Sequence, residues 1–149
     1  MAGLKRAVVE SRTPTLSPVL SLELPPEPRS PSAARRLVLE AFAEWDFSSA
    51  AAQDAALIAT ELVTNAIIHA RPTAITLTIA RRGESVELRV TDDGHGKVEL
   101  KPVIAGAVTG RGLRFLDELA AHWAVEPAAI GPGKTVVARL PRSSVDGDA

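Results

Sequence analysis

Alternating hydrophobic and polar residues mark the expected strands of this chain. Residues 18–24 alternate and end at the proline cluster 25–28, which predicts a strand closed by a turn. Two further alternating runs occupy residues 75–92 and are joined by an Arg-Arg-Gly-Glu turn, which predicts a β-hairpin. Two last strands are expected around residues 123–126 and 135–140, on either side of an Ile-Gly-Pro-Gly-Lys turn.

Hydrophobic residues at helical spacing predict three helices. The first should begin at Ser30, with this serine as the N-cap and the following proline at the first helical position. The second is capped by Ser48 or Ser49 and should run to about Ala70, because the next residue precedes a proline and is pushed out of the α region. The third is expected to open near Gly112.

The order of these elements is strand, two helices, hairpin, loop, helix and hairpin, which predicts an α/β (α+β) two-layer sandwich. Its sheet should be mixed and mostly antiparallel, with the three helices on one face. The 149 residues fit a single domain, which we place at residues 17–141. Residues 1–16 and 142–149 are polar without a period, and we expect them to be disordered tails.

Composition and charge exclude several classes of function. The chain has no cysteine, so disulfides and thiolate zinc sites are excluded. Its formal net charge is −1, and a sequence pI of about 6.3 leaves no global basic field for DNA or RNA. No apolar run approaches the roughly 18 residues needed to cross a bilayer, and the N-terminus lacks the apolar core of a signal peptide. We therefore expect a cytoplasmic protein that binds neither nucleic acid nor membrane.

The second helix carries a polar stripe on an otherwise apolar segment. Glu61, Asn65 and His69 stand four residues apart and should share one face. The stripe can be a structural hydrogen-bond network or a polar seam that faces a ligand, since a buried carboxylate needs a partner. In the second interpretation the Asn65 amide oxygen suits Mg²⁺, and Glu61 could take a proton from an attacking hydroxyl.

The strand that closes the first hairpin ends in a second polar position. Asp92 has the same parity as the hydrophobic residues of its strand, so it should face the buried side while Asp93 faces solvent. Gly94 and Gly96 allow the backbone to approach a ligand closely. The alternative is an ordinary Asp-Gly turn.

Residues 110–113, Gly-Arg-Gly-Leu, open the third expected helix, where free N–H groups and the helix dipole favour a phosphate. The alternative is a plain glycine-rich helix entry. Residues 131–135, Gly-Pro-Gly-Lys-Thr, are not a P-loop, because Ala128 stands where that motif needs its first glycine and a strand follows. The histidines lie on different elements and are interpreted as structural or surface residues: His69, His95 and His122.

These three places, taken in order, resemble motifs of the gyrase/Hsp90/histidine-kinase/MutL-type ATPase superfamily. Residues 61–70, ELVTNAIIHA, are similar to its N box. Residues 90–96, VTDDGHG, are similar to its first glycine box, and residues 110–113, GRGL, to its second. The resemblance spans about residues 17–141. Within the superfamily, the small size and the segment that follows GRGL resemble the anti-sigma-factor serine kinases and their actinobacterial relatives.

The resemblance implies a Bergerat-type ATP-binding fold that uses ATP and Mg²⁺. Asn65 would bind the Mg²⁺, and Glu61 would be the general base. Asp92 would accept a hydrogen bond from the adenine amino group, and Thr135 would join the adenine end through water. The glycine-box residues would surround the rest of the nucleotide under a lid of residues 97–109: Gly94 and Gly96 at the adenine side, and Gly110, Arg111, Gly112 and Leu113 at the phosphates.

The resemblance further implies a kinase that phosphorylates a serine on an anti-anti-sigma partner of STAS type, holds a sigma factor when that partner is modified, and commonly forms dimers. In the better-known kinases an arginine stands two residues before the second glycine box, where this chain has Val108, and Arg111 is the candidate substitute. The leading hypothesis is therefore a serine/threonine kinase with anti-sigma activity. One alternative is an ATP-gated partner-switching module without kinase activity, and another is an α/β domain that binds no nucleotide. A sensor histidine kinase is not expected, because no dimerisation helix carries a phosphoacceptor histidine.

Overall fold

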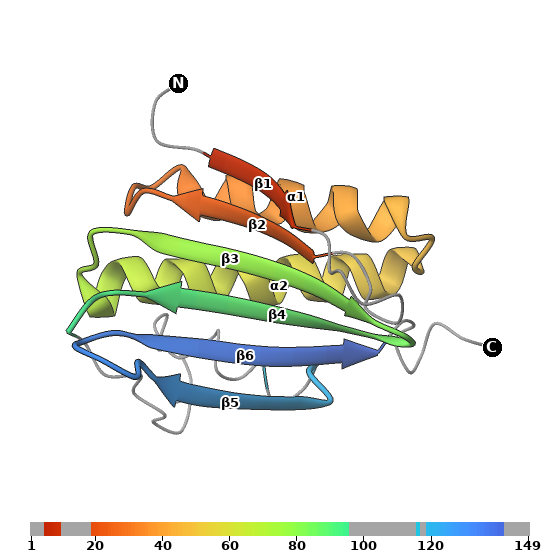
Figure 1. Ribbon diagram of the computed structural model, residues 1–149. Coiled ribbons are helices and arrows are strands. Elements are labelled where there is room, and N and C mark those ends of the chain that lie inside the picture. Colours follow the sequence, from red (N-terminus) through yellow and green to blue (C-terminus); the bar gives the residue numbers. More distant parts are fainter. Residues whose placement is uncertain (1–4, 10–18, 96–115, 117–118, 142–149) are drawn as a thin grey trace, which may run out of the picture.

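One sheet, covered on one face by two helices, makes up the described part of the chain (Figure 1). This computed structural model describes residues 5–9, 19–95, 116 and 119–141. Its strands lie in the order β1-β2-β3-β4-β6-β5, and each neighbouring pair is antiparallel. The two-layer sandwich is thereby confirmed, although the described strands contain no parallel pair and the expected mixture is not found among them. The strands are β1 (Lys5–Val9), β2 (Val19–Leu24), β3 (Ile75–Arg82), β4 (Ser85–Asp92), β5 (His122–Pro127) and β6 (Lys134–Pro141).

Part of the expected N-terminal tail belongs to the sheet. Residues Lys5–Val9 pair with β2 in an antiparallel register that joins Lys5 to Glu23 and Val9 to Val19. The prediction of disorder over residues 1–16 was therefore wrong for these five positions. An edge strand takes its hydrogen bonds from a distant partner, so a short sequence without a clear period does not reveal it.

The first helix, α1 (Ser30–Glu44), begins one position earlier than predicted. Arg29 is its N-cap, and Ser30 already lies in the first turn, next to Pro31. The buried Ser30 hydroxyl donates a hydrogen bond to Pro25 O at 2.5 Å, across the turn that follows β2. The prediction of Ser30 as the N-cap was wrong because the proline turn uses this hydroxyl, and the helix N–H groups do not.

The second helix, α2 (Ser49–Asn65), begins as predicted, with Ser48 Oγ accepting a hydrogen bond from Ala51 N at 3.0 Å. It continues as a π-helical turn, η1 (Ala66–Ala70), so the helical segment ends where the sequence predicted. Arg71 follows in the left-handed conformation, with φ of 49°. This conformation is costly for a residue with a side chain, so the helix end is held by its surroundings.

The third predicted helix, from near Gly112, lies largely outside the described residues. Leu116 and Leu119 have helical backbone, and Ala120 N donates a hydrogen bond to Leu116 O at 3.0 Å. Leu116 is fully buried in the hydrophobic core. Two α-helices with complete bounds are therefore counted where three were predicted. Within the described ranges, no helix combines the length and the apolar character that crossing a membrane requires.

The hydrophobic core lies between the two helices and the sheet. Phe42 of α1 meets Phe47 edge to face, with the ring centroids 5.1 Å apart, and so closes the α1–α2 connection. Each fully buried aliphatic side chain contributes about 1.5–3 kcal/mol to folding. The alternating apolar residues of β2, β3 and β4 point into this core, as the period of two predicted. Its fully buried members include Leu24, Val38, Ile58, Val63, Leu77 and Leu88.

The predicted hairpin is formed by β3 and β4. Its loop is only Gly83 and Glu84, because Arg81 and Arg82, expected in the turn, belong to β3. Gly83 has φ of 62°, which glycine adopts without a Cβ clash. Because β3 extends to Arg82, the Arg82 side chain lies on the face of the sheet that carries no helix and forms an ion pair with Glu87 there.

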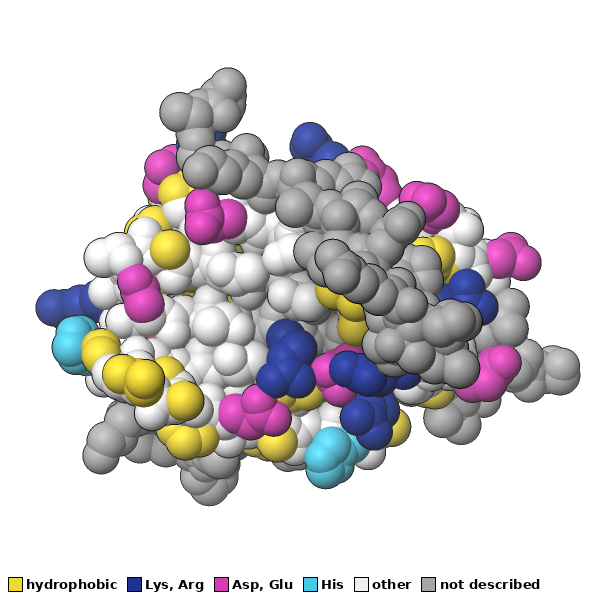
Figure 2. Space-filling view, in the orientation of Figure 1, with side chains coloured by type: hydrophobic (Ala, Val, Ile, Leu, Met, Phe, Trp, Pro, Cys, Tyr) yellow, Lys and Arg dark blue, Asp and Glu magenta, His cyan; other side chains and the backbone are white. Residues whose placement is uncertain are grey.

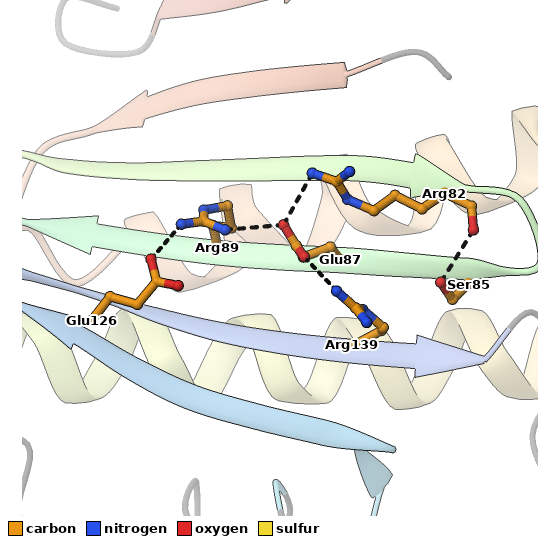
Figure 3. Close-up of polar contacts among 6 residues, drawn as sticks. All are labelled: Arg82, Ser85, Glu87, Arg89, Glu126 and Arg139. Carbon is orange, nitrogen blue, oxygen red and sulfur yellow. Dashed lines mark hydrogen bonds and ion pairs between the residues drawn. The ribbon is translucent and has the colours of Figure 1, made fainter. Parts of the chain in front are cut away.

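A cluster of charged side chains occupies this helix-free face (Figure 2). Glu87 of β4 is only 4% exposed although no helix covers it. Its carboxylate lies 3.0 Å from Arg89 Nη1, 3.2 Å from Arg139 Nη2 and 3.6 Å from Arg82 Nη2 (Figure 3). Arg89 also lies 2.6 Å from the Glu126 carboxylate. Cations, rather than apolar side chains, therefore enclose the Glu87 charge.

The arginines decide the protonation of Glu87. Burial by itself raises the pKa of this carboxyl group, but hydrogen bonds from Arg89 and Arg139 and the charges of Arg82 and Arg89 outweigh it, so the pKa lies below its ordinary value of 4.5. A carboxyl group with a lowered pKa in the folded state stabilises the fold above its unfolded pKa. That stabilisation is lost as the pH falls through the folded pKa.

We expect the free energy of unfolding to fall as the pH drops below 4.5, partly because Glu87 becomes protonated. E87Q removes this titration and should show a shallower pH dependence there. It should also lose about 1 kcal/mol at neutral pH, a modest loss because the arginines are partly exposed. Urea unfolding at pH values from about 3 to about 7 measures both effects. E23Q removes an exposed carboxylate from the same face as a control, and an E87Q curve parallel to that of E23Q would contradict the role of Glu87.

Candidate functional site

The end of β4 holds a buried carboxylate on the helix-facing side of the sheet. Asp92 has the parity of the buried apolar residues of its strand and is 4% exposed, so its predicted inward orientation is confirmed. Its Oδ1 accepts a hydrogen bond from Gly94 N at 2.9 Å. Its Oδ2 accepts one from Lys134 Nζ at 2.9 Å. Both oxygens therefore have partners, and one of these partners is a cation.

Lys134 reaches Asp92 because the two residues are cross-strand partners. β6 begins at Lys134, which is opposite Asp92 in the antiparallel β4–β6 register. The Lys134 side chain is 12% exposed and that of Asp92 1%, so water is largely excluded from the pair. Gly133 has φ of 117°, and a Cβ on it would lie 2.5 Å from Asp92 O. Only glycine combines this conformation with so close an approach.

Asp93 faces the other way and ties the loop to the segment between η1 and β3. It is exposed, as predicted. Its Oδ1 accepts hydrogen bonds from Thr73 N at 2.8 Å and Ala74 N at 3.2 Å, and its Oδ2 accepts one from the Thr73 hydroxyl. The Thr73 hydroxyl is the main reason that the pKa of Asp93 lies below its ordinary value, and the backbone N–H groups add to this effect. The two adjacent aspartates thus hold the loop from both sides.

Gly94 packs directly on the end of the helical segment. A Cβ on Gly94 would lie 2.0 Å from Ala70 O and 2.7 Å from Ala70 Cβ, a distance that no side chain tolerates. His95 N donates a hydrogen bond to the same Ala70 O at 3.1 Å. The first glycine box and the end of the N-box helix are therefore in contact, which the sequence alone did not establish.

Glu61 and Asn65 lie one helical turn apart on α2, and both are half-buried. Leu62 and Val63, between them in sequence, are buried in the core. The polar pair therefore lies on the side of α2 that turns away from the centre of the core. His69, predicted on the same stripe, is exposed and lies in the π-helical turn that follows Asn65.

Thr135 faces the opposite side of the sheet from Asp92. Its Oγ1 lies 2.8 Å from Oγ1 of Thr91, its cross-strand partner. Lys134, and not Thr135, contacts the Asp92 carboxylate, and the water-mediated role of Thr135 at the adenine end stays a prediction. Sequence reasoning missed Lys134, although a signal existed, since alternate residues of a strand share a face. The residues with the parity of Lys134 are apolar and buried: Val136, Ala138 and Leu140.

The phosphate end of the expected site stays a prediction. Its residues lie outside the described part of the chain: Gly96, Gly110, Arg111, Gly112, Leu113 and the expected lid 97–109, which includes Val108. Among the residues that the structure does describe, no three histidine, aspartate or glutamate side chains gather as metal ligands.

Asp92 and Lys134 combine a hydrogen-bond acceptor with a hydrogen-bond donor. A carboxylate only accepts hydrogen bonds and an ammonium group only donates them, and Asp92 and Lys134 lie side by side at the ends of their strands. Gly94 and Gly133 let the backbone pack closely beside the pair, on Ala70 O and on Asp92 O respectively. Such an arrangement suits the edge of a nitrogenous base.

The sequence profile of the histidine kinase-like ATPase domain matches residues 24–140. The match covers most of the chain and includes Glu61, Asn65, Asp92 and Lys134. The chain belongs to this family. The ATPase superfamily predicted from the three motifs is thereby confirmed, and ATP binding is the property that membership of the family implies. No curated protein matches the chain.

Two solved structures are similar to this histidine kinase-like ATPase domain, and the first of them shares its fold. The RsbU and RsbW domains of Rv1364c from Mycobacterium tuberculosis match with a TM-score of 0.60 and 18% identity over 84% of this chain. The matched part is 32% of that structure, so the ATPase domain spans about a third of the mycobacterial chain. The histidine kinase domain of the blue-light activated kinase from Erythrobacter litoralis EL346 matches with a TM-score of 0.48 and 23% identity, over 74% of this chain and 60% of that one. At 18% identity, the first match shows the fold alone.

G94A should disrupt the contact between the loop after β4 and Ala70 at the end of η1, and so destabilise the fold. The added Cβ meets the Ala70 backbone at 2.0 Å, and backbone cannot rotate away, so we expect a loss of about 3 kcal/mol in the free energy of unfolding. The control is G131A, at a glycine with φ of 75° and open space around it, which should lose only about 1 kcal/mol from backbone strain. Urea unfolding of both variants measures the difference, and equal losses would show that the Gly94–Ala70 contact has no special role.

Proposed function

We propose that this ATPase domain binds Mg-ATP and acts as an anti-sigma-factor-type serine/threonine kinase. It phosphorylates a serine on an anti-anti-sigma protein of STAS type, and it sequesters a sigma factor in the cytoplasm. The observation that carries the proposal is the contact between Gly94, in the loop after Asp92, and Ala70, at the end of the helix that bears Glu61 and Asn65. This contact supports the assignment of both segments to one site within a histidine kinase-like ATPase domain.

Asp92 provides the adenine end of the proposed site. Its carboxylate accepts a hydrogen bond from the 6-amino group of adenine, a role that suits a group with acceptors only. Its burial supports this assignment, because a hydrogen bond to a charged group is stronger where water is excluded. The Gly94 N–H fixes Oδ1 and so sets the orientation of the carboxylate.

Asn65 and Glu61 provide the reacting end. Asn65 holds Mg²⁺ through its amide oxygen, and Glu61, one turn earlier, is the general base. Their half-buried positions, on the side of α2 turned away from the core, support access by a ligand. In transfer, the partner's serine oxygen bonds to the γ-phosphorus, its proton passes to Glu61, and the bond to the bridging oxygen breaks to release ADP. Mg²⁺, when bound, neutralises charge on the phosphate oxygens.

The partners are proposed from fold and resemblance. The fold is shared with a structure that contains an RsbW domain, which supports a place in a partner-switching system, with homodimerisation as in the kinases that the sequence resembles. A second candidate function is an ATP-gated partner-switching module without kinase activity. Val108 favours this second candidate, since it stands where an arginine is expected and phosphoryl transfer depends on charge stabilisation.

N65A should weaken the binding of ATP in the presence of Mg²⁺ by about tenfold or more, because the amide ligand of the metal is lost. ATP binding in the presence of EDTA should change little. Isothermal titration calorimetry with ATP, with and without Mg²⁺, measures both. T64A is the matched control, because Thr64 is equally half-buried on α2 and its hydroxyl bonds to Thr60 O at 2.8 Å. If titration of the wild-type chain with ATP and Mg²⁺ gave no heat of binding, the proposed function would be wrong.

E61Q should separate binding from transfer. Glutamine keeps the size of Glu61 and one acceptor oxygen but cannot take a proton, so transfer should fall by about 10²–10⁴-fold while ATP affinity is retained. Transfer of labelled γ-phosphate to purified STAS-type anti-anti-sigma proteins of the source organism measures the rate. Wild-type transfer that E61Q matches would exclude Glu61 as the base. A wild-type chain that binds ATP and transfers nothing would favour the ATP-gated module.

A further inference from the structure

A buried ion pair lies at the adenine end of the proposed ATP site. Lys134 Nζ is 2.9 Å from Asp92 Oδ2, and the two side chains are 12% and 1% exposed. Removing two charges from water is costly, so such a pair contributes little to stability by itself. The pair lies at the ends of β4 and β6 and not within the sheet. Its position and its cost both suggest a role in recognition.

The backbone holds the two groups in a fixed arrangement. Asp92 and Lys134 are opposite each other in the β4–β6 register, and both project to the helix-facing side. Gly133 packs on Asp92 O and fixes the point at which β6 begins. A carboxylate has about four lone-pair sites and an ammonium group has three donors, so each group can enter more than one hydrogen bond. The pair therefore presents an acceptor and a donor side by side.

We propose that Lys134 determines the base specificity of the ATP site by donating a hydrogen bond to N1 of adenine, while Asp92 accepts one from the neighbouring 6-amino group. The inference rests on the proposed ATP binding. Adenine carries an acceptor at N1 directly beside the donor at its 6-position, and Lys134 and Asp92 carry the complementary donor and acceptor.

The order of the two groups discriminates between purines. Guanine has an acceptor at its 6-position and a donor at N1, the reverse of adenine. A guanine placed with the same sugar orientation would set its 6-oxygen against the Asp92 carboxylate and its N1–H against the Lys134 ammonium. Two acceptors or two donors would then face each other, which is unfavourable where water is excluded.

A nucleotide that lacks only the N1 acceptor tests the proposal. In 1-deaza-ATP a C–H group replaces N1 and the 6-amino group remains. The wild-type chain should bind 1-deaza-ATP about tenfold or more weakly than ATP, because a charge-assisted hydrogen bond is lost. It should bind 7-deaza-ATP, altered at another edge of the base, with nearly the affinity of ATP. Calorimetry or competition against a fluorescent ATP analogue gives the ratios.

Variants of Lys134 assign the effect to this side chain. K134M keeps the aliphatic stem and removes the donor, so it should bind ATP more weakly and bind ATP and 1-deaza-ATP equally. If K134M does not fold, the ratio of the affinities for ATP and 1-deaza-ATP is measured on K134A instead, with the same expected result. R139M removes one positive charge from the other face of the same strand and should keep the wild-type ratio.

Each outcome has one meaning. Equal wild-type affinity for ATP and 1-deaza-ATP overturns the inference but leaves ATP binding intact, whereas no wild-type binding of ATP removes the proposed function itself. A Lys134 variant that keeps the wild-type penalty for 1-deaza-ATP shows that another group reads N1. A variant that binds ATP more tightly than the wild type shows that Lys134 obstructs the site, and this also overturns the inference.

Discussion

The carboxylate of Asp92 lies on the apolar side of the sheet, where an unpaired charge would be strongly destabilising. This constraint determines how three distant segments of the chain meet. One oxygen requires the Gly94 N–H and so fixes the loop after β4, while the other requires Lys134 and so fixes the start of β6. Because Gly94 also packs on Ala70, the same loop reaches the end of the helix that carries Asn65. The segments of the candidate site are therefore brought together by the hydrogen bonds that the buried Asp92 carboxylate requires.

Each face of the sheet carries a buried carboxylate paired with basic side chains, but the two pairs differ in their exposure to water. On the helix-free face, Glu87 is enclosed by three arginine side chains that remain 33–53% exposed, so the network stays in contact with water (Figure 3). On the helix-facing side, Asp92 meets a single lysine that is 12% exposed. The exposed network suits a sheet surface. The enclosed pair suits recognition, because each of its hydrogen bonds is stronger where water is excluded.

The helix end shows how local geometry serves the same arrangement. Ala70 ends the π-helical turn after Asn65, just before the left-handed Arg71, and its O accepts a hydrogen bond from His95 N. Turns of this kind are rare and recur at functional sites. Here the turn follows directly after Asn65, and its His69 is exposed.

The sequence by itself determined two helices, five of the strands and the inward direction of Asp92, because periods of two and of about 3.6 residues follow directly from strand and helix geometry. It also placed Glu61 and Asn65 on one face of α2 and identified the ATPase superfamily. Only the tertiary structure decided that Ser30 bonds to the proline turn, that residues 5–9 form an edge strand, and that Lys134 meets Asp92. Each of these depends on a partner far away in the chain. Local periodicity predicts which face of the sheet or helix a side chain occupies. The register between strands determines which side chain of the neighbouring strand it contacts.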